Sequence, residues 1–285
     1  MNIHQNNRNK YFDYAHFEYI PAIHPHKKMQ SCELLFNSFD YVGEKSRISL
    51  LKKLIYKLKK GIGINNTVWG VKYESGNFGW EFYFYNHDNP ELRMKKVIKI
   101  IKPIFQVSIE LNHDIEKIPY FMFSIDFDQN SLNNITVKDI NIYVLGGSRC
   151  DGISYLFKKN KLILGNHYNF FYPNKDMKSL IRKICVSPFV NISNPPLHKI
   201  LLPNLINCFK ICIANKRNSD CIYFARVNLN QFLYFLRKFN YPINLIEFIE
   251  KNRDRLNHLL YDVEFDYKQE KDKLKIVKSG YYGIF

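Results

Sequence analysis

The chain has few of the residues from which disulfide frameworks and zinc sites are built. Its 285 residues include six cysteines, and no two of them form a CxxC pair. Structural zinc sites need closely spaced Cys and His ligands, and disulfide frameworks are typical of small secreted domains. We therefore expect neither a zinc site nor a disulfide framework.

The chain also lacks long apolar runs and interdomain linkers. No stretch reaches the roughly 18 apolar residues of a membrane-spanning helix, and the start of the chain lacks the apolar core of a secretory signal. No Pro-, Gly- or Ser-rich stretch divides the sequence. We expect one cytoplasmic domain over residues 1–285 that does not bind a membrane, with residues 1–43 as an N-terminal arm or cap.

Motifs of several enzyme classes are absent. The glycine clusters at 61–63 and 146–148 extend to neither a GxGxxG nor a P-loop pattern, which excludes these nucleotide-binding folds. The nine histidines are scattered and form no HExxH motif, and no GxSxG nucleophile motif occurs. No motif therefore predicts the chemistry of this chain, and the remaining evidence is the pattern of residues along the predicted strands.

Acidic residues are scarce relative to basic ones. The chain has 42 Lys and Arg residues against 26 Asp and Glu residues, which gives a net charge of +16. Such a charge attracts polyanions, so nucleic acids, anionic membranes and diphosphate-bearing small molecules are candidate partners. Lys, Asn, Ile, Tyr and Phe are abundant together, as in AT-rich coding sequences, so part of this charge need have no function.

The pattern that is present is a recurring pair of strands in which apolar and polar side chains alternate. In the strand predicted for 80–86 the two faces carry Trp80, Phe82 and Phe84 on one side and Glu81, Tyr83 and Tyr85 on the other. Five such pairs predict ten strands, at 68–74, 80–86, 121–127, 140–145, 153–158, 161–172, 209–215, 221–227, 261–268 and 273–278.

Amphipathic helices accompany these strand pairs. The clearest is 44–60, and a second begins at the N-cap Asn89 and ends near Ile101. Further helices are predicted at 174–185, 195–207, 228–239 and 245–259. This order predicts an α+β fold in which a ten-stranded antiparallel barrel has its apolar strand faces under the helices and a polar lumen inside.

The chain resembles the ABBA-type aromatic prenyltransferases, the PT-barrel family, in length, strand count, helix placement and polar inward faces over about residues 44–285. These enzymes lack a DDxxD metal motif, and so does this chain, in which the nearest pattern is Asp126-Phe127-Asp128. The resemblance implies a barrel of tandem αββα units. It also implies electrophilic transfer of an isoprenyl group from dimethylallyl or geranyl diphosphate to an aromatic small molecule or peptide side chain.

The resemblance implies a role for each polar face. Fixed cations would stabilise the diphosphate leaving group, and the candidates are Lys72, Lys210, Arg226 and Lys275. Aromatic rings would shield the allyl cation, and the candidates are Tyr83, Tyr85 and Tyr143. The alternative is that these cations are solvent-exposed or paired with neighbouring carboxylates.

A carboxylate would orient the acceptor or take its proton. Glu264, flanked by Asp262 and Asp266, is the first candidate and Glu81 the second. No cofactor is required, and Asp126 would serve if Mg²⁺ is used. The alternatives are an exposed acidic edge for the trio and a lysine-paired strand end for Asp126.

Two other functions remain open at this point. The first is a nucleic-acid-binding module, in which basic helices contact phosphates and aromatic side chains stack on bases. We do not expect nucleic acid, because lysines opposite apolar stripes are ordinary solvated faces and no RRM or helix-turn-helix signature occurs. The second is a non-catalytic barrel that binds a small apolar ligand, which requires an apolar lumen.

Overall fold

The computed structural model describes most of the chain. The described residues are 26–42, 44–63, 67–85, 94–109, 111, 115, 117–128, 136–137, 139–148, 150–271 and 273–284. The aromatic part of the predicted arm and the predicted N-cap at Asn89 lie outside these residues. From Cys32 onward the arm is a helix that was not predicted.

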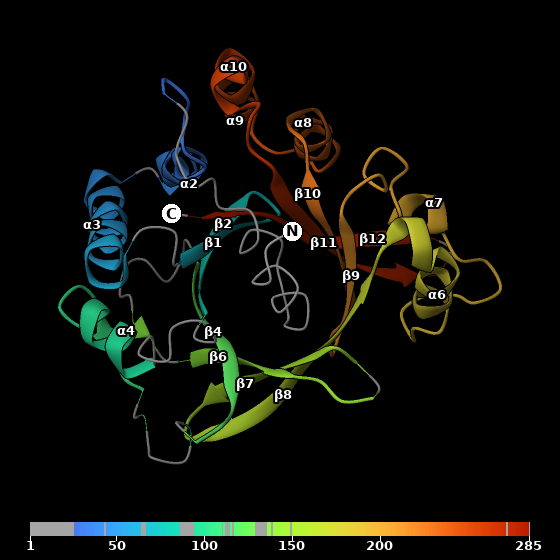
Figure 1. Cartoon of the computed structure of the whole chain (residues 1–285), viewed down its shortest axis with the longest axis horizontal. Coiled ribbons are helices and arrows are strands. Elements are labelled where there is room, and N and C mark those ends of the chain that lie inside the picture. Colours follow the sequence, from blue (N-terminus) through green and yellow to red (C-terminus); the bar gives the residue numbers. More distant parts are fainter. Residues whose placement is uncertain are drawn as a thin grey trace, which may run out of the picture.

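Ten antiparallel strands close into a barrel (Figure 1). They are β1 (Thr67–Glu74), β2 (Asn77–Tyr85), β4 (Tyr120–Asp128), β6 (Asp139–Leu145), β7 (Gly152–Lys158), β8 (Lys161–Phe171), β9 (Lys210–Asn215), β10 (Asp220–Val227), β11 (Tyr261–Glu270) and β12 (Lys273–Ile284). Each pairs with the barrel strands before and after it along the chain, and β12 returns to pair with β1. The predicted closed antiparallel barrel is confirmed.

Helices lie outside the barrel on three sides in the view of Figure 1 and make the fold mixed α+β, whereas none of the described helices lies outside β7. They are α2 (Cys32–Phe39), the 3₁₀ helix η2 (Asp40–Val42), α3 (Lys45–Ile62), α4 (Met94–Ile101), α6 (Pro173–Cys185), α7 (Leu197–Ile200), α8 (Leu229–Lys238), α9 (Ile243–Lys251) and α10 (Arg253–Leu256). A separate parallel pair joins β3 (Gln106–Val107) to β5 (Thr136–Val137). Across the described residues, no helix has the length and apolar character that a membrane crossing needs.

Three elements differ from their predicted extents. The helix predicted at 195–207 is only the four-residue α7, and the one predicted at 245–259 is divided into α9 and α10 at Asn252. The last strand, predicted to end at Lys278, continues to Ile284. This extension supplies every residue of β12 that pairs with β1, so the barrel closes through a segment that the sequence analysis treats as a tail.

The main apolar core lies between the barrel and the helices. Trp80 and Phe82 of β2 are buried on the outer face, as the alternation predicts. Trp80 also donates a hydrogen bond of 2.8 Å from Nε1 to Ser38 Oγ of α2, so the indole N–H is satisfied inside the core. Helix α3 buries one side, which includes Leu54 and Ile55, in the same core.

Leu54→Ala should lower the free energy of unfolding by about 2 to 5 kcal/mol, because it leaves a cavity under α3 where the native side chain is 1% exposed. Urea unfolding measures this change. Ser49→Ala, at an exposed position of the same helix, should change it by less than about 0.5 kcal/mol. Equal effects of the two variants would contradict the packing of α3 on the barrel.

Candidate functional site

The inward side chains form two zones. At the barrel end that holds the β1–β2 turn lies a set of ionisable side chains, which we call the charged mouth: Lys72, Glu81, Asp126, Lys216, Glu264, Asp266 and Lys278. Beyond it lies a belt of buried tyrosines with successive ring centroids 6.0 to 6.2 Å apart, in the order Tyr168, Tyr143, Tyr83, Tyr282 and Tyr223. The inner faces are therefore polar at the mouth and aromatic further in.

The centre of the charged mouth is a buried ion pair. The Lys72 ammonium contacts the carboxylate of Glu264, whose side chain is fully buried, and it also donates a hydrogen bond to Tyr282 Oη. Glu81 Oε2 lies 3.2 Å from the same ammonium. Gly280 makes room for this pair, because a Cβ there would lie 2.9 Å from Lys72 Cδ and 3.1 Å from Glu264 Oε1.

The two partners keep each other charged. Burial by itself favours the neutral form of each group, but the charge of Glu264 outweighs burial and raises the pKa of Lys72. Likewise burial would raise the pKa of Glu264, but the Lys72 ammonium holds it well below its usual range. Glu264 is therefore a poor proton acceptor, and its position indicates charge balance rather than the acid–base role predicted from the sequence.

A second ion pair and a thiol adjoin the first. Lys216 Nζ lies 2.6 Å from Asp266 Oδ1, and the Cys221 thiol donates to Glu264 Oε2 at 2.9 Å. Burial, and then the charge of Glu264, raise the pKa of the Cys221 thiol, so it stays protonated.

The ligand atoms of Cys221, Glu264 and Asp266 lie within 4.8 Å of one another, close enough to share a metal ion. The fit to a metal is poor, because each carboxylate already faces a lysine ammonium and the thiol holds its proton. The group has no imidazole either, so it does not match the two-His, one-carboxylate set of non-haem iron(II) oxygenases.

A pocket of about 520 Å³ opens at the charged mouth. Its wall includes Lys72, Glu81, Asp126 and Lys278. Among these, Asp126 is open to the pocket, whereas the Lys72 and Glu81 side chains are 11% and 13% exposed. Of these four groups, a bound molecule would therefore meet Asp126 most directly.

Asp126 is held by polar neighbours. Its Oδ1 accepts a hydrogen bond of 3.1 Å from Ser124 Oγ, and its Oδ2 accepts one of 2.7 Å from Asn141 Nδ2. Confinement by the barrel wall, and then the charge of Glu81, raise the pKa of the Asp126 carboxyl even though its side chain meets the water of the pocket. The metal-compatible group of the described residues does not include Asp126, so Mg²⁺ at this position is not supported.

Most of the predicted lumen residues point inward. Tyr83, Tyr85 and Tyr143 are all buried in the inner aromatic cluster, and Tyr83 donates a hydrogen bond to Glu81. Lys72, Glu81 and Glu264 meet at the charged mouth. The predicted inner faces of β1, β2, β6 and β11 are therefore correct.

The four predicted diphosphate ligands do not converge. Lys210 pairs in register with Ala225. It lies one inward position along β9 from the row of paired residues that contains Lys72. Its ammonium lies 5.4 to 5.5 Å from the centroids of three aromatic rings. Arg226 lies over the Phe209 ring at 4.0 Å. Lys275 is exposed and pairs with Glu270 at the surface. A single site built from Lys72, Lys210, Arg226 and Lys275 is therefore not formed.

The strand pattern of the sequence does not identify Tyr282 or Lys216. It ends the last strand at Lys278, so Tyr282 is assigned to a tail, although Gly280, Tyr282 and Ile284 continue the alternation of β12. It places Lys216 in the turn after β9, where alternation does not predict which way a side chain points. The Lys216 side chain is long enough to reach Asp266 from there.

Comparison with known proteins gives one distant relative. No family model matches the chain. An alignment 270 positions long, which covers 81% of the chain, gives 22% identity to a putative JmjC domain-containing protein of Acanthamoeba polyphaga mimivirus. The alignment spans 44% of that relative's length. Because the relative is named for a JmjC domain and not for prenyl transfer, the prediction of an aromatic prenyltransferase is wrong.

Lys72→Met should lower the free energy of unfolding by about 3 to 5 kcal/mol, because Glu264 would be left buried and without its ion-pair partner. The double variant Lys72→Met/Glu264→Gln should lower the free energy of unfolding clearly less, because the unpaired charge is then removed. Lys158→Met breaks a more exposed pair with Asp139 and should cost at most about 1 kcal/mol. Urea unfolding at neutral pH would refute the buried pair if the double variant were less stable than Lys72→Met.

Asp126 should make stability fall as the pH rises. Its folded-state pKa is raised above 3.8, so the folded protein retains a proton that the unfolded chain has lost. Between about pH 5 and pH 8, where Glu264 stays ionised, Asp126→Asn should therefore become progressively more stable relative to the native chain. Urea unfolding across this range measures the difference, and a difference independent of pH would contradict the raised pKa.

Proposed function

We propose that the barrel binds a small molecule that carries an acidic group beside hydrogen-bond donors such as hydroxyl or amine groups. The observation that carries this proposal is the pocket of about 520 Å³ whose wall presents Asp126, Glu81 and Lys278 to one volume. Pockets of this size with a few convergent polar groups are typical of small-molecule sites.

The cation of this site is Lys278. It lines the pocket, and among the described side chains it makes no ion pair within 4.0 Å. Lys72 differs, since Glu264 and Glu81 already balance its charge. An acidic group that enters the pocket would therefore pair with Lys278, in a charge-assisted hydrogen bond.

The acceptors of this site are the carboxyl groups of Asp126 and Glu81. Glu81 is fixed by Lys72 and Tyr83, so it presents its oxygens in one orientation. The raised pKa of Asp126 allows this carboxyl to exchange a proton with a bound molecule closer to neutral pH than an ordinary aspartate does. We include in this proposal that Asp126 acts as a general acid or base in an enzymatic step other than prenyl transfer.

The chain spans less than half the length of the relative that it matches. In that putative JmjC domain-containing protein, a domain of this kind therefore accompanies other sequence. Helices outside a closed ten-stranded barrel support a PT-barrel-like architecture, which we propose for the fold alone. The apolar-ligand alternative is less well supported, because the pocket wall is charged.

Thermal-shift screening with amino acids, 2-hydroxy acids and sugar phosphates, followed by calorimetry, tests the proposal. At least one probe should bind, and Lys278→Ala should weaken it about tenfold or more, as expected for loss of a charge-assisted hydrogen bond. Lys275→Ala is the matched control, because Lys275 lies on the same strand but pairs with Glu270 at the surface. The proposal fails if no probe binds, or if both variants weaken binding equally.

A further inference from the structure

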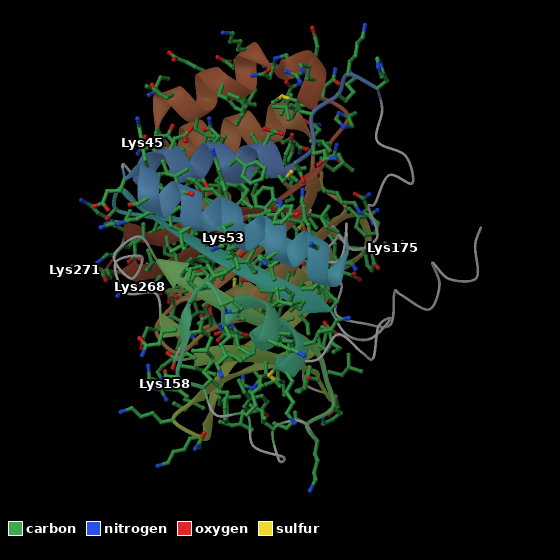
Figure 2. The ribbon with its side chains drawn as sticks, turned by 90° about the vertical axis from the view of Figure 1, so that its left-hand side faces the viewer. Lys45, Lys53, Lys158, Lys175, Lys268 and Lys271 are labelled. Carbon is green, nitrogen blue, oxygen red and sulfur yellow. The ribbon has the colours of Figure 1, made fainter. Side chains whose placement is uncertain are left out.

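Helix α3 carries an exposed stripe that is basic except for two serines and one aromatic residue. The exposed positions of the helix follow a helical spacing and are Lys45, Ser49, Lys52, Lys53, Tyr56 and Lys60, with Ser46 beside them in the first turn. We call them the α3 stripe, and Figure 2 shows Lys45 and Lys53 on the face of this helix turned to the viewer. Over 18 residues the helix is about 27 Å long, so the stripe is an extended cationic surface.

Helix α4 enlarges this surface. It packs beside α3 (Figure 1), where Gly61 of α3 makes room for Ile100 of α4. Its exposed lysines are Lys95, Lys99 and, just after its last turn, Lys102. Neither α3 nor α4 contains an aspartate or a glutamate, so no carboxylate within either helix neutralises this surface.

Tyr56 distinguishes the α3 stripe from an ordinary solvated lysine face. Its side chain is 61% exposed in the middle of the stripe. It also lines a groove of about 450 Å³ between α2 and α3, together with Phe36, Lys52, Lys59 and Glu33. An aromatic ring between lysines at the edge of a groove is the arrangement on which unpaired bases stack while their phosphates contact cations.

An anionic membrane fits this surface less well. Peripheral helices insert an apolar face into the lipid interface. The apolar face of α3, with Leu51, Leu54 and Leu58, is already buried in the protein core. The stripe therefore offers charge and one tyrosine, which suits a polyanion with exposed bases.

We propose that the α3 stripe and the lysines of α4 bind single-stranded nucleic acid, with Tyr56 stacked on a base. This surface lies outside the barrel and is independent of the pocket at the charged mouth. It differs from the expectation that lysines opposite apolar stripes are only solvated faces, and the experiment below distinguishes the two.

Fluorescence anisotropy with a labelled mixed-sequence single strand of about 20 nucleotides tests this inference in the full chain. Over about 50 to 200 mM salt, Lys52→Glu/Lys53→Glu should weaken binding at least about tenfold and reduce the salt slope by about 1.4, the value for two lost phosphate contacts. Lys175→Glu/Lys178→Glu on α6 makes the same change of net charge at exposed positions on another side of the barrel (Figure 1) and should weaken binding less than about threefold.

Tyr56 provides a second, independent variant. Tyr56→Ala should weaken the single strand about tenfold but leave a duplex of the same sequence nearly unchanged, whereas Tyr56→Phe should bind like the native chain. All of these positions are exposed, so circular dichroism should show native folding. Equal losses from the α3 and α6 double variants, equal effects of Tyr56→Ala on single strand and duplex, or binding only to anionic phospholipid vesicles would each overturn the proposal.

Discussion

Closure of the barrel between β1 and β12 is the constraint on which the rest of the structure depends. Six residue pairs, from Val68 with Ile284 to Tyr73 with Ser279, join the first barrel strand to the last. Two glycines of β12, Gly280 and Gly283, leave room for the side chains that pack against this pair of strands on its inner and outer faces. A Cβ at Gly283 would lie 2.2 Å from Trp69 Cζ2 in the outer core, and one at Gly280 would meet the Lys72–Glu264 pair inside. The same seam therefore completes the hydrophobic core and builds the charged mouth.

The charged mouth follows from placing ionisable groups where water is largely excluded. Burying an ionised carboxylate is costly unless a cation or hydrogen bonds compensate it, and Lys72 and Lys216 do this for Glu264 and Asp266. In all, three lysines face four carboxyl groups there. The proton that Asp126 retains through its raised pKa moves the mouth toward charge balance. The groups left to respond to a bound molecule are consequently Asp126 and Lys278 at the pocket.

The sequence predicts the fold better than it predicts the site. Alternation is a local property, so it identified ten strands and the inward direction of Lys72, Glu81 and Glu264. It fails where the period of two is broken. Arg226 has a φ of 59° at the bulge of β10, and Lys275 precedes on β12 the register shift with β11 that falls between Ile276 and Lys278. Nor can alternation show which lysine neutralises Glu264, because the partners are 192 residues apart in the chain.

The distribution of charge separates two uses of the same residue type. Inside the barrel, Lys72 and Lys216 are paired with Glu264 and Asp266, so these two lysines do not contribute to the surplus that gives the chain its net charge of +16. A compositional bias toward lysine would spread that surplus over all exposed positions. Helices α3 and α4 instead carry exposed lysines with no acidic residue in either helix, and the exposed Tyr56 lies among these lysines. Bias explains a high lysine count, but it does not explain the placement of Tyr56 at the groove, for which the proposed single-stranded nucleic acid supplies both charge and a flat aromatic surface.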